Sequence, residues 1–153
     1  MKPSPFDLHR PRTLEEVLDL LSRYGEEAKL IAGGQSLVPL MNLRMATPAV
    51  VVDLNLVAGL AGISSDGHAL RIGAMTRQKH MITDPLVARG APLLARAVSH
   101  VGHVQTRSRG TVGGSLAHAD PSAELPLVMV TLGAEFVLRS MRGARSIAAR
   151  EFF

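Results

Sequence analysis

The sequence contains no cysteine, no tryptophan and only one tyrosine among its 153 residues. Without cysteine it can supply no thiolate ligand for an iron–sulfur cluster, no disulfide and no cysteinyl link to a cofactor, so any such centre must lie on another chain. No stretch reaches the roughly 18 uninterrupted apolar residues of a membrane-spanning helix, and the start lacks the apolar core of a signal peptide. We therefore expect a soluble, cytoplasmic protein.

The charge balance is basic, with 17 lysines and arginines against 13 acidic residues and a net charge of +4. Such a balance can indicate nucleic-acid binding, because basic side chains neutralise phosphates. Here the basic residues are spread along the chain, and the few aromatic residues are not interleaved with them, so the sequence provides no stacking platform for bases. Nucleic acid is therefore not an expected partner.

A helix is predicted over residues 13–24. Thr13 is a suitable N-cap, Glu16 completes a capping box three residues later, and Gly25 stands where a helix can end. Residues 28–32 then form a short apolar run, which is typical of a strand.

After this run come a pair of glycines, an apolar segment from Leu37 that suits a short helix, and a β-branched run over residues 50–54. The β-branched run is short enough for a buried strand. The first part of the chain is thus expected to form a βαβ-like unit.

The division expected is into two lobes, residues 1–57 and residues 58–153. In the second lobe hairpins are predicted over residues 60–73 and 134–149, and helices over residues 76–82, 92–101 and 122–132. Ser122 is the expected cap of the last helix. Residues 103–118 lose the helical period and are expected to be irregular. The fold class predicted is α/β (α+β).

The first candidate site is the run Ala-Gly-Gly-Gln-Ser at residues 32–36, between a predicted strand and a predicted helix. Paired glycines let successive backbone N–H groups point into one hollow, and a helix N-terminus adds partial positive charge, which suits a phosphate. Gln35 and Ser36 could add side-chain donors. A tight turn that merely needs glycine explains the same residues equally well.

The second candidate is residues 109–115, Arg-Gly-Thr-Val-Gly-Gly-Ser. Neither candidate matches the Gly-x-Gly-x-x-Gly fingerprint or the Walker loop, so neither a standard Rossmann site nor a nucleoside-triphosphate hydrolase is indicated. Two such segments on two lobes could clasp a pyrophosphate from both sides. That arrangement favours a dinucleotide cofactor.

Other polar residues give weaker signals. Glu124 could accept hydrogen bonds from ribose or ribityl hydroxyls, or could simply be a first-turn acid favoured by the helix dipole. His103, His118 and Asp120 fit no metal-ligand spacing, so no metal site is expected. Arg107 and Arg109 could face a phosphate or solvent. No nucleophile motif supports hydrolytic catalysis, and no catalytic acid or base is assigned.

At these residues the sequence resembles the FAD-binding subunit of molybdopterin dehydrogenases, of the kind found in aerobic carbon monoxide dehydrogenase and related to the flavin domain of xanthine dehydrogenase. The motifs that carry the resemblance follow one another in the family's order. They are residues 32–37 with the trailing residues 42–44, residues 72–76 (Ile-Gly-Ala-Met-Thr), and residues 110–121 (Gly-Thr-Val-Gly-Gly-Ser-Leu-Ala-His-Ala-Asp-Pro).

The resemblance implies a two-lobed FAD-binding fold of the vanillyl-alcohol oxidase (PCMH) type, with FAD bound non-covalently between the lobes. In the family the subunit continues past a Phe-Phe pair like Phe152-Phe153 into a further α/β domain, which this sequence lacks. The implied cofactor-binding residues are Ala32, Gly33, Gly34, Gln35, Ser36, Leu37, Gly102, Gly110, Thr111, Gly113, Gly114, Ser115 and Glu124.

The implied partners are a molybdenum-binding large subunit, which carries the molybdopterin, and a small subunit, which carries [2Fe-2S] clusters. Electrons would pass from the clusters to FAD and then to an external acceptor such as NAD or a quinone. Two other interpretations stay open: a stand-alone FAD oxidoreductase, and a docking lobe that holds no cofactor.

Overall fold

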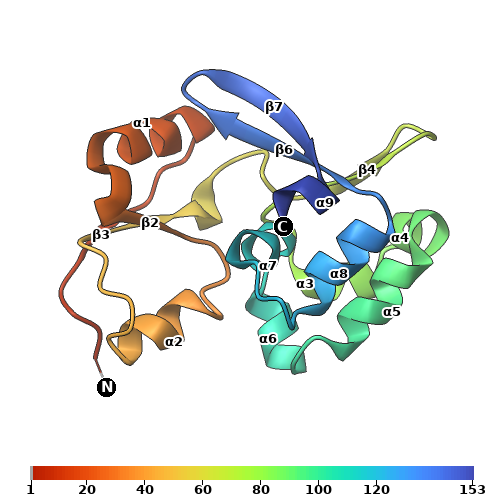
Figure 1. The fold of residues 1–153 in the computed structure, drawn as a ribbon, viewed down its shortest axis with the longest axis horizontal. Coiled ribbons are helices and arrows are strands. Elements are labelled where there is room, and N and C mark those ends of the chain that lie inside the picture. Colours follow the sequence, from red (N-terminus) through yellow and green to blue (C-terminus); the bar gives the residue numbers. More distant parts are fainter. Residues whose placement is uncertain (1) are drawn as a thin grey trace.

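The computed structural model describes residues 2–153. Figure 1 shows two parts side by side, a small parallel sheet with two helices and a larger, mainly helical part with two hairpins. The strands are β1 (Asp7–His9), β2 (Ala28–Ile31), β3 (Val50–Asp53), β4 (Ile63–Ser65), β5 (Leu70–Ile72), β6 (Glu135–Ser140) and β7 (Gly143–Ala148). The α-helices are α1 (Leu14–Tyr24), α2 (Leu37–Asn42), α3 (Gln78–Thr83), α4 (Pro85–Gly90), α5 (Pro92–His100), α6 (Val104–Arg109), α7 (Val112–His118), α8 (Glu124–Thr131) and α9 (Ala149–Phe152). Two 3-10 turns are η1 (Gly25–Glu27) and η2 (Leu54–Leu56). The mixed fold class predicted from the sequence is confirmed.

The first sheet has the order β1-β3-β2, with both neighbouring pairs parallel. Successive side chains of β3 point to opposite faces, so Val50 and Val52 lie on one face and Val51 on the other. Val50 and Val52 pack with Val17 of α1 and Ala28 of β2 in one buried cluster. Burying each valine contributes about 1.5–3 kcal/mol, so this central strand anchors the first part of the chain.

The predicted βαβ-like unit is confirmed as β2, α2 and β3. The predicted first helix is confirmed as well: the Thr13 hydroxyl accepts from the Glu16 N–H at 3.2 Å, Glu16 accepts in return from the Thr13 N–H at 3.4 Å, and Gly25 caps the end. Strand β1 was not predicted. It is a three-residue edge strand with no periodicity of its own, and its pairing with β3 is what defines it.

The second part is built around another buried cluster, which includes Met81, Val87, Leu94, Val98 and Leu125. These residues come from α3, α4, α5 and α8, so the helices pack on one another rather than on a central sheet. Both predicted hairpins are confirmed, as β4–β5 and β6–β7.

Residues 103–118 are helical rather than irregular, and that prediction was wrong. α6 and α7 occupy most of the segment, with Gly113 and Gly114 inside α7. The helix begins there because the Thr111 hydroxyl accepts from the Gly114 N–H at 3.1 Å. This cap and packing against the rest of the chain outweigh the low helix propensity of glycine, which is a weak preference that tertiary contacts override.

Two further helices differ from expectation. Helix α4 was not predicted at all; Asp84 caps it by accepting from the Leu86 N–H at 2.8 Å. Helix α8 starts at Glu124 after Ala123, not at a Ser122 cap. The Ser122 hydroxyl and N–H both donate to Asp120 Oδ1, at 2.7 and 2.8 Å, so this hydroxyl is turned away from the helix.

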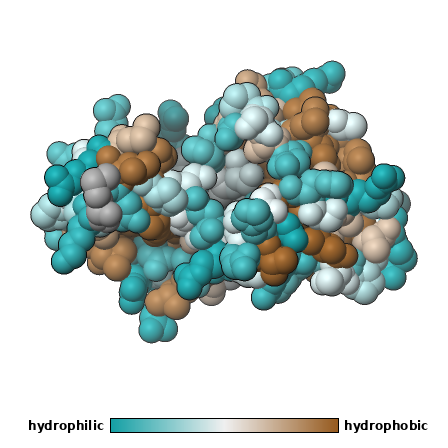
Figure 2. Space-filling view, turned by 90° about the horizontal axis from the view of Figure 1, so that it is seen from below, coloured by the Kyte–Doolittle hydropathy of each residue, from teal (hydrophilic) through white to brown (hydrophobic). Residues whose placement is uncertain are grey.

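The C-terminal phenylalanines pack against one side chain of β6. The Phe136 ring meets Phe152 and Phe153 edge-on, with centroids 5.1 and 5.7 Å apart. Elsewhere on the surface, Figure 2 shows hydrophobic residues in separate patches among hydrophilic ones. Among residues 2–153, no helix has the length and apolar character needed to cross a bilayer. The boundary between residues 57 and 58 stays a prediction.

Candidate functional site

The two glycine-rich segments, far apart in sequence, touch each other. We call residues 32–36 the first glycine segment and residues 109–115 the second. A Cβ placed on Gly33 would lie 2.8 Å from the Gly110 Cα and 2.9 Å from the Arg109 carbonyl carbon, and closer still to the Arg109 oxygen. Real Cβ atoms essentially never approach so closely. Glycine is therefore required at position 33 for the two backbones to meet.

The first glycine segment offers unpaired backbone donors. Within residues 2–153, no acceptor is recorded for four consecutive backbone N–H groups. These belong to Gly33, Gly34, Gln35 and Ser36. The carbonyls on the same backbone are held by side chains: Asn55 Nδ2 donates to the Ala32 oxygen at 2.9 Å, and Gln35 Nε2 to the Gly33 oxygen at 3.1 Å. Gly34 has φ +71°, which also favours glycine.

The second glycine segment differs from this pattern, because the N–H groups of its glycine pair are already used. Gly113 donates to the Ala74 carbonyl at 2.8 Å, and Gly114 to the Thr111 hydroxyl at 3.1 Å. The adjacent N–H groups of Val112 and Ser115 are bonded as well, to the Thr76 and Thr111 carbonyls. The expectation that both glycine pairs present open amides is therefore met only by the first.

What the second pair provides is close packing. A Cβ on Gly113 would lie 2.6 Å from the Ala74 Cβ, and one on Gly114 would lie 3.3 Å from the Ala32 Cβ. The second segment thus forms a support behind the first, fixed by tertiary contacts on both sides.

The third motif, residues 72–76, leads directly to residues that pair with the second glycine segment. The strand-like bridge of Arg77 with Thr111 is antiparallel, and the Gln78 N–H donates to the Gly110 carbonyl at 2.9 Å. The buried Thr76 hydroxyl bonds both backbone groups of Gly62, at 2.9 and 3.0 Å. All three motifs therefore meet in one structural unit.

An open cleft of about 650 Å³ lies against the first glycine segment. Of the predicted residues, Ala32, Gly33, Gly34 and Gln35 line it. The cations Arg77 and Arg109 line it too, and so does Asp53. The Asp53 carboxylate is engaged by Arg10 Nε at 3.7 Å and by the Asn55 N–H at 2.9 Å. Free N–H groups in a cleft that two arginine residues line fit an anion such as a diphosphate.

The remaining predicted residues lie outside the lining of this cleft. Ser36 and Leu37 lie at the start of α2. The predicted residues of the second glycine segment lie in α7 or directly before it. They are Gly110, Thr111, Gly113, Gly114 and Ser115. Gly102, with φ +43°, lies in the turn before α6, and Glu124 is half-buried at the start of α8.

The structure places the arginines and the aspartate whose roles the sequence left open. The Arg107 guanidinium donates to the carbonyls of Val101 and Gly102, at 2.8 and 3.1 Å, and so caps a turn, whereas Arg109 lines the cleft. No cluster of three potential metal ligands occurs in the part of the chain that the structure describes. Hydrogen bonds from the Ser122 hydroxyl and N–H hold the pKa of Asp120 below its ordinary value.

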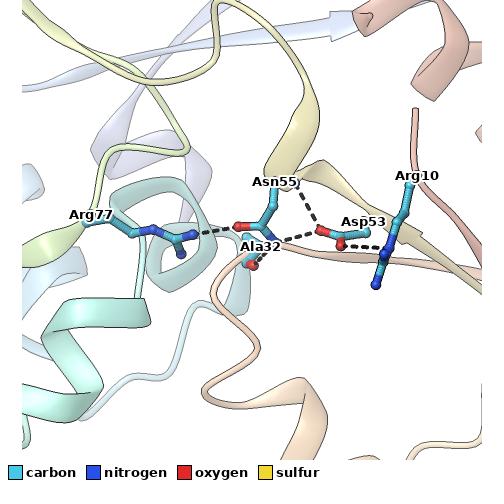
Figure 3. A network of polar contacts seen from close by, with 5 residues as sticks. All are labelled: Arg10, Ala32, Asp53, Asn55 and Arg77. Atoms are coloured by element: carbon cyan, nitrogen blue, oxygen red, sulfur yellow. Dashed lines mark hydrogen bonds and ion pairs between the residues drawn. The ribbon is translucent and has the colours of Figure 1, made fainter. Parts of the chain in front are cut away.

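Sequence reasoning missed Asn55 and Arg77. Figure 3 shows them in a chain of polar contacts that runs from Arg10 through Asp53 to Arg77, with Asn55 also reaching Ala32. Asn55 follows the end of β3, and Arg77 follows the third motif directly. The only sequence signal for Asn55 and Arg77 was their place directly after a predicted strand and after the third motif. Their hydrogen bond to each other depends on tertiary structure, which the sequence does not show.

Comparison with known proteins agrees with this geometry. Residues 4–153 match the family described as FAD binding domain in molybdopterin dehydrogenase. The 6-hydroxypseudooxynicotine dehydrogenase complex subunit alpha of Paenarthrobacter nicotinovorans is 46% identical over 99% of this chain and 51% of its own length. The carbon monoxide dehydrogenase medium chain of Hydrogenophaga pseudoflava is 40% identical over 100% of this chain and 53% of its own length.

A solved structure gives the same result. Carbon monoxide dehydrogenase from Hydrogenophaga pseudoflava, in a form that lacks the Mo-pyranopterin moiety, superposes with a TM-score of 0.98 at 41% identity, over 100% of this chain and 53% of that chain. The chain thus spans about half the length of the curated relatives it matches.

Proposed function

Because the chain belongs to the family of FAD-binding domains of molybdopterin dehydrogenases, we propose that it holds FAD, without a covalent link, as an electron-transfer component of a molybdenum hydroxylase. The observation that supports this most directly is a row of four N–H groups for which residues 2–153 provide no recorded acceptor, in a cleft that Arg77 and Arg109 line. An array of donors and cations at one cleft is suited to the two negative charges of a diphosphate.

We assign the residues as follows. The N–H groups of residues 33–36 bind the diphosphate, and Arg77 and Arg109 balance its charge. Ala32 and Leu37 flank that position, and Glu124 accepts hydrogen bonds from cofactor hydroxyls. The residues that keep the backbones close enough, or add a hydroxyl, are Gly102, Gly110, Thr111, Gly113, Gly114 and Ser115. The flavin supplies the redox chemistry, and the protein positions it.

We propose a division of labour with partner chains. The 153 residues contain no cysteine to ligate an iron–sulfur cluster, and in this proposal electrons arrive from a cluster on a small partner subunit. A large subunit carries the molybdopterin, and NAD or a quinone takes the electrons away. The cofactor lies between the lobe of residues 1–57 and that of residues 58–153.

The test is a titration of the purified 153-residue chain with FAD, followed by flavin fluorescence and by retention of flavin absorbance after gel filtration. Saturable binding that a Gly33→Ala change weakens is the expected result. The absence of retained flavin, both alone and with partner subunits present, would overturn the proposal in favour of a docking lobe without cofactor. Steady turnover of a small substrate by the flavin-loaded chain alone would favour a stand-alone oxidoreductase.

A further inference from the structure

Asn55 and Arg77 connect the two glycine segments through side-chain hydrogen bonds. Asn55 Nδ2 donates to the Ala32 carbonyl at 2.9 Å, and Asn55 Oδ1 accepts from Arg77 Nη2 at 2.6 Å. Arg77 Nη1 in turn donates to the Arg109 carbonyl. We call these two side chains the brace. It joins the carbonyls that lie next to the Gly33–Gly110 contact, as Figure 3 shows for its Ala32 end.

The brace is one of the points at which the two parts of the chain are joined. Within residues 2–153, the bond between Asn55 and Arg77 is the one recorded side-chain hydrogen bond that joins residues 2–57 to residues 58–153. Asn55 is itself fixed, because its N–H and its Nδ2 both donate to Asp53 Oδ1, at 2.9 and 2.5 Å. Asp53 is paired with Arg10. Asn55 is therefore fixed to the first sheet, because Asp53 is the last residue of β3.

Peptide geometry connects the brace with the donors of the first glycine segment. A trans peptide is planar, and its C=O and N–H point in opposite directions. When Asn55 holds the Ala32 carbonyl, it therefore also sets the direction of the Gly33 N–H. Gln35 acts in the same way on the next peptide, through the Gly33 carbonyl. Without Asn55 the first peptide is free to rotate, since glycine imposes little restraint of its own.

From this geometry we propose that Asn55 and Arg77 are positioning residues for diphosphate binding. They orient the Gly33 N–H and hold the two glycine segments in register before the ligand arrives. The inference rests on the proposed function in naming the ligand. The structural half, which concerns the order of the amides in the FAD-free chain, can be tested by itself.

Two roles for Arg77 have to be separated. A planar guanidinium can donate to Asn55 and to the Arg109 carbonyl at once, whereas a lysine ammonium supplies the charge without that fork. If Arg77 served only as a cation, Arg77→Lys would retain FAD affinity and Asn55→Ala would have no effect. If the brace positions the amides, Asn55→Ala weakens binding although it leaves the net charge unchanged, and Arg77→Ala weakens binding at least as much because it also removes a cation from the cleft.

The experiment compares Asn55→Ala, Arg77→Ala, Arg77→Lys and the double alanine variant. Arg71→Ala is the matched control: it removes an equal charge from an exposed arginine whose recorded partner is Asp66 of the β4–β5 hairpin. Circular dichroism confirms folding, FAD affinity is measured by fluorescence, and ¹⁵N relaxation reports the order parameters of the Gly33 and Gly34 amides without FAD.

We expect each of the three single brace variants to bind FAD about tenfold more weakly or worse, which is the cost of losing a charge-assisted hydrogen bond. The double variant is expected to be little weaker than the stronger single variant, because both remove the same link. Amide order is expected to fall in the FAD-free brace variants and to stay unchanged in the control.

Wild-type affinity and wild-type amide order in Asn55→Ala would overturn the inference. So would full rescue by Arg77→Lys. If the wild-type chain binds no FAD, the proposed function fails, and the order parameters still decide whether the brace orders the segment.

Discussion

Replacing Gly33 by alanine is the sharpest single test of the contact between the two glycine segments. The new Cβ would lie 2.8 Å from the Gly110 Cα, where ordinary contact starts at 3.4 Å, so the backbones must separate by at least about 0.6 Å (3.4 − 2.8). The φ of Gly33 is outside the left-handed region, so the penalty is steric and not torsional. The opposing atoms are backbone, which cannot swing aside as a flexible side chain can.

Overpacking of this kind costs about 1–3 kcal/mol. For a chain of this size each kcal/mol lowers Tm by about 2–4 °C, so a fall of about 2–12 °C is expected. FAD affinity is expected to fall about tenfold or more as well, because a binding constellation tolerates displacements of only about 0.5 Å.

Gly90→Ala is the matched control. It makes the same chemical change at the end of α4, where φ is again ordinary and the nearest atoms, of Leu70, lie 3.9 Å away. Reduced freedom of the unfolded chain is expected to make it neutral or up to about 1 kcal/mol more stable. Thermal unfolding and FAD titration of both variants are the measurements. Indistinguishable Tm and affinity in the two would refute the account of the contact.

Three further outcomes are expected. Thr111→Val, which removes the hydroxyl that accepts from Gly114, should lower stability by about 0.5–2 kcal/mol in urea unfolding, and Thr111→Ser should restore most of it. Thr13→Ala should cost a similar amount by breaking the capping box of α1, yet leave FAD affinity unchanged; a parallel loss of affinity would mean that α1 influences the cleft. The backbone N–H groups of Ala69 and His68, with Arg71, hold the pKa of Asp66 below its ordinary 3.8. The resulting stability is present above that value and lost as pH falls through the lowered folded-state pKa. Asp66→Ala should therefore be less stable than wild type at pH 7, with a gap that narrows below pH 3.8, and a gap independent of pH would contradict this.

Local signals in the sequence predicted a large share of the fold. The α1 capping box, the two hairpin turns and the β2–α2–β3 unit all depend on residues close together in the chain, and the structure has them. Strand β1 and the helices over residues 104–118 were missed because they depend on distant partners. Strand β1 is defined by its edge pairing with β3. In α7, Gly113 packs closely on Ala74.

The candidate site shows the same division. The first glycine segment was expected to present open backbone donors, and within residues 2–153 the structure records no acceptor for them. That these donors bind a diphosphate stays a prediction. The second was expected to act in the same way, but the N–H groups of its glycine pair donate to the Ala74 carbonyl and the Thr111 hydroxyl instead. No local pattern in a sequence tells whether a given N–H will find an acceptor forty residues away. The Asn55–Arg77 pair was missed for the same reason.

The contact between Gly33 and Arg109 also has a consequence for the order of events during synthesis. The four N–H groups of residues 33–36 are complete within the first quarter of the chain, but the backbone of Arg109 and Gly110 that they lie against is translated much later. Joining such distant stretches requires loop-closure entropy to be overcome before any contact rewards it. A nascent chain therefore cannot capture its cofactor early, and the ligand, once captured, stabilises the joined halves by mass action.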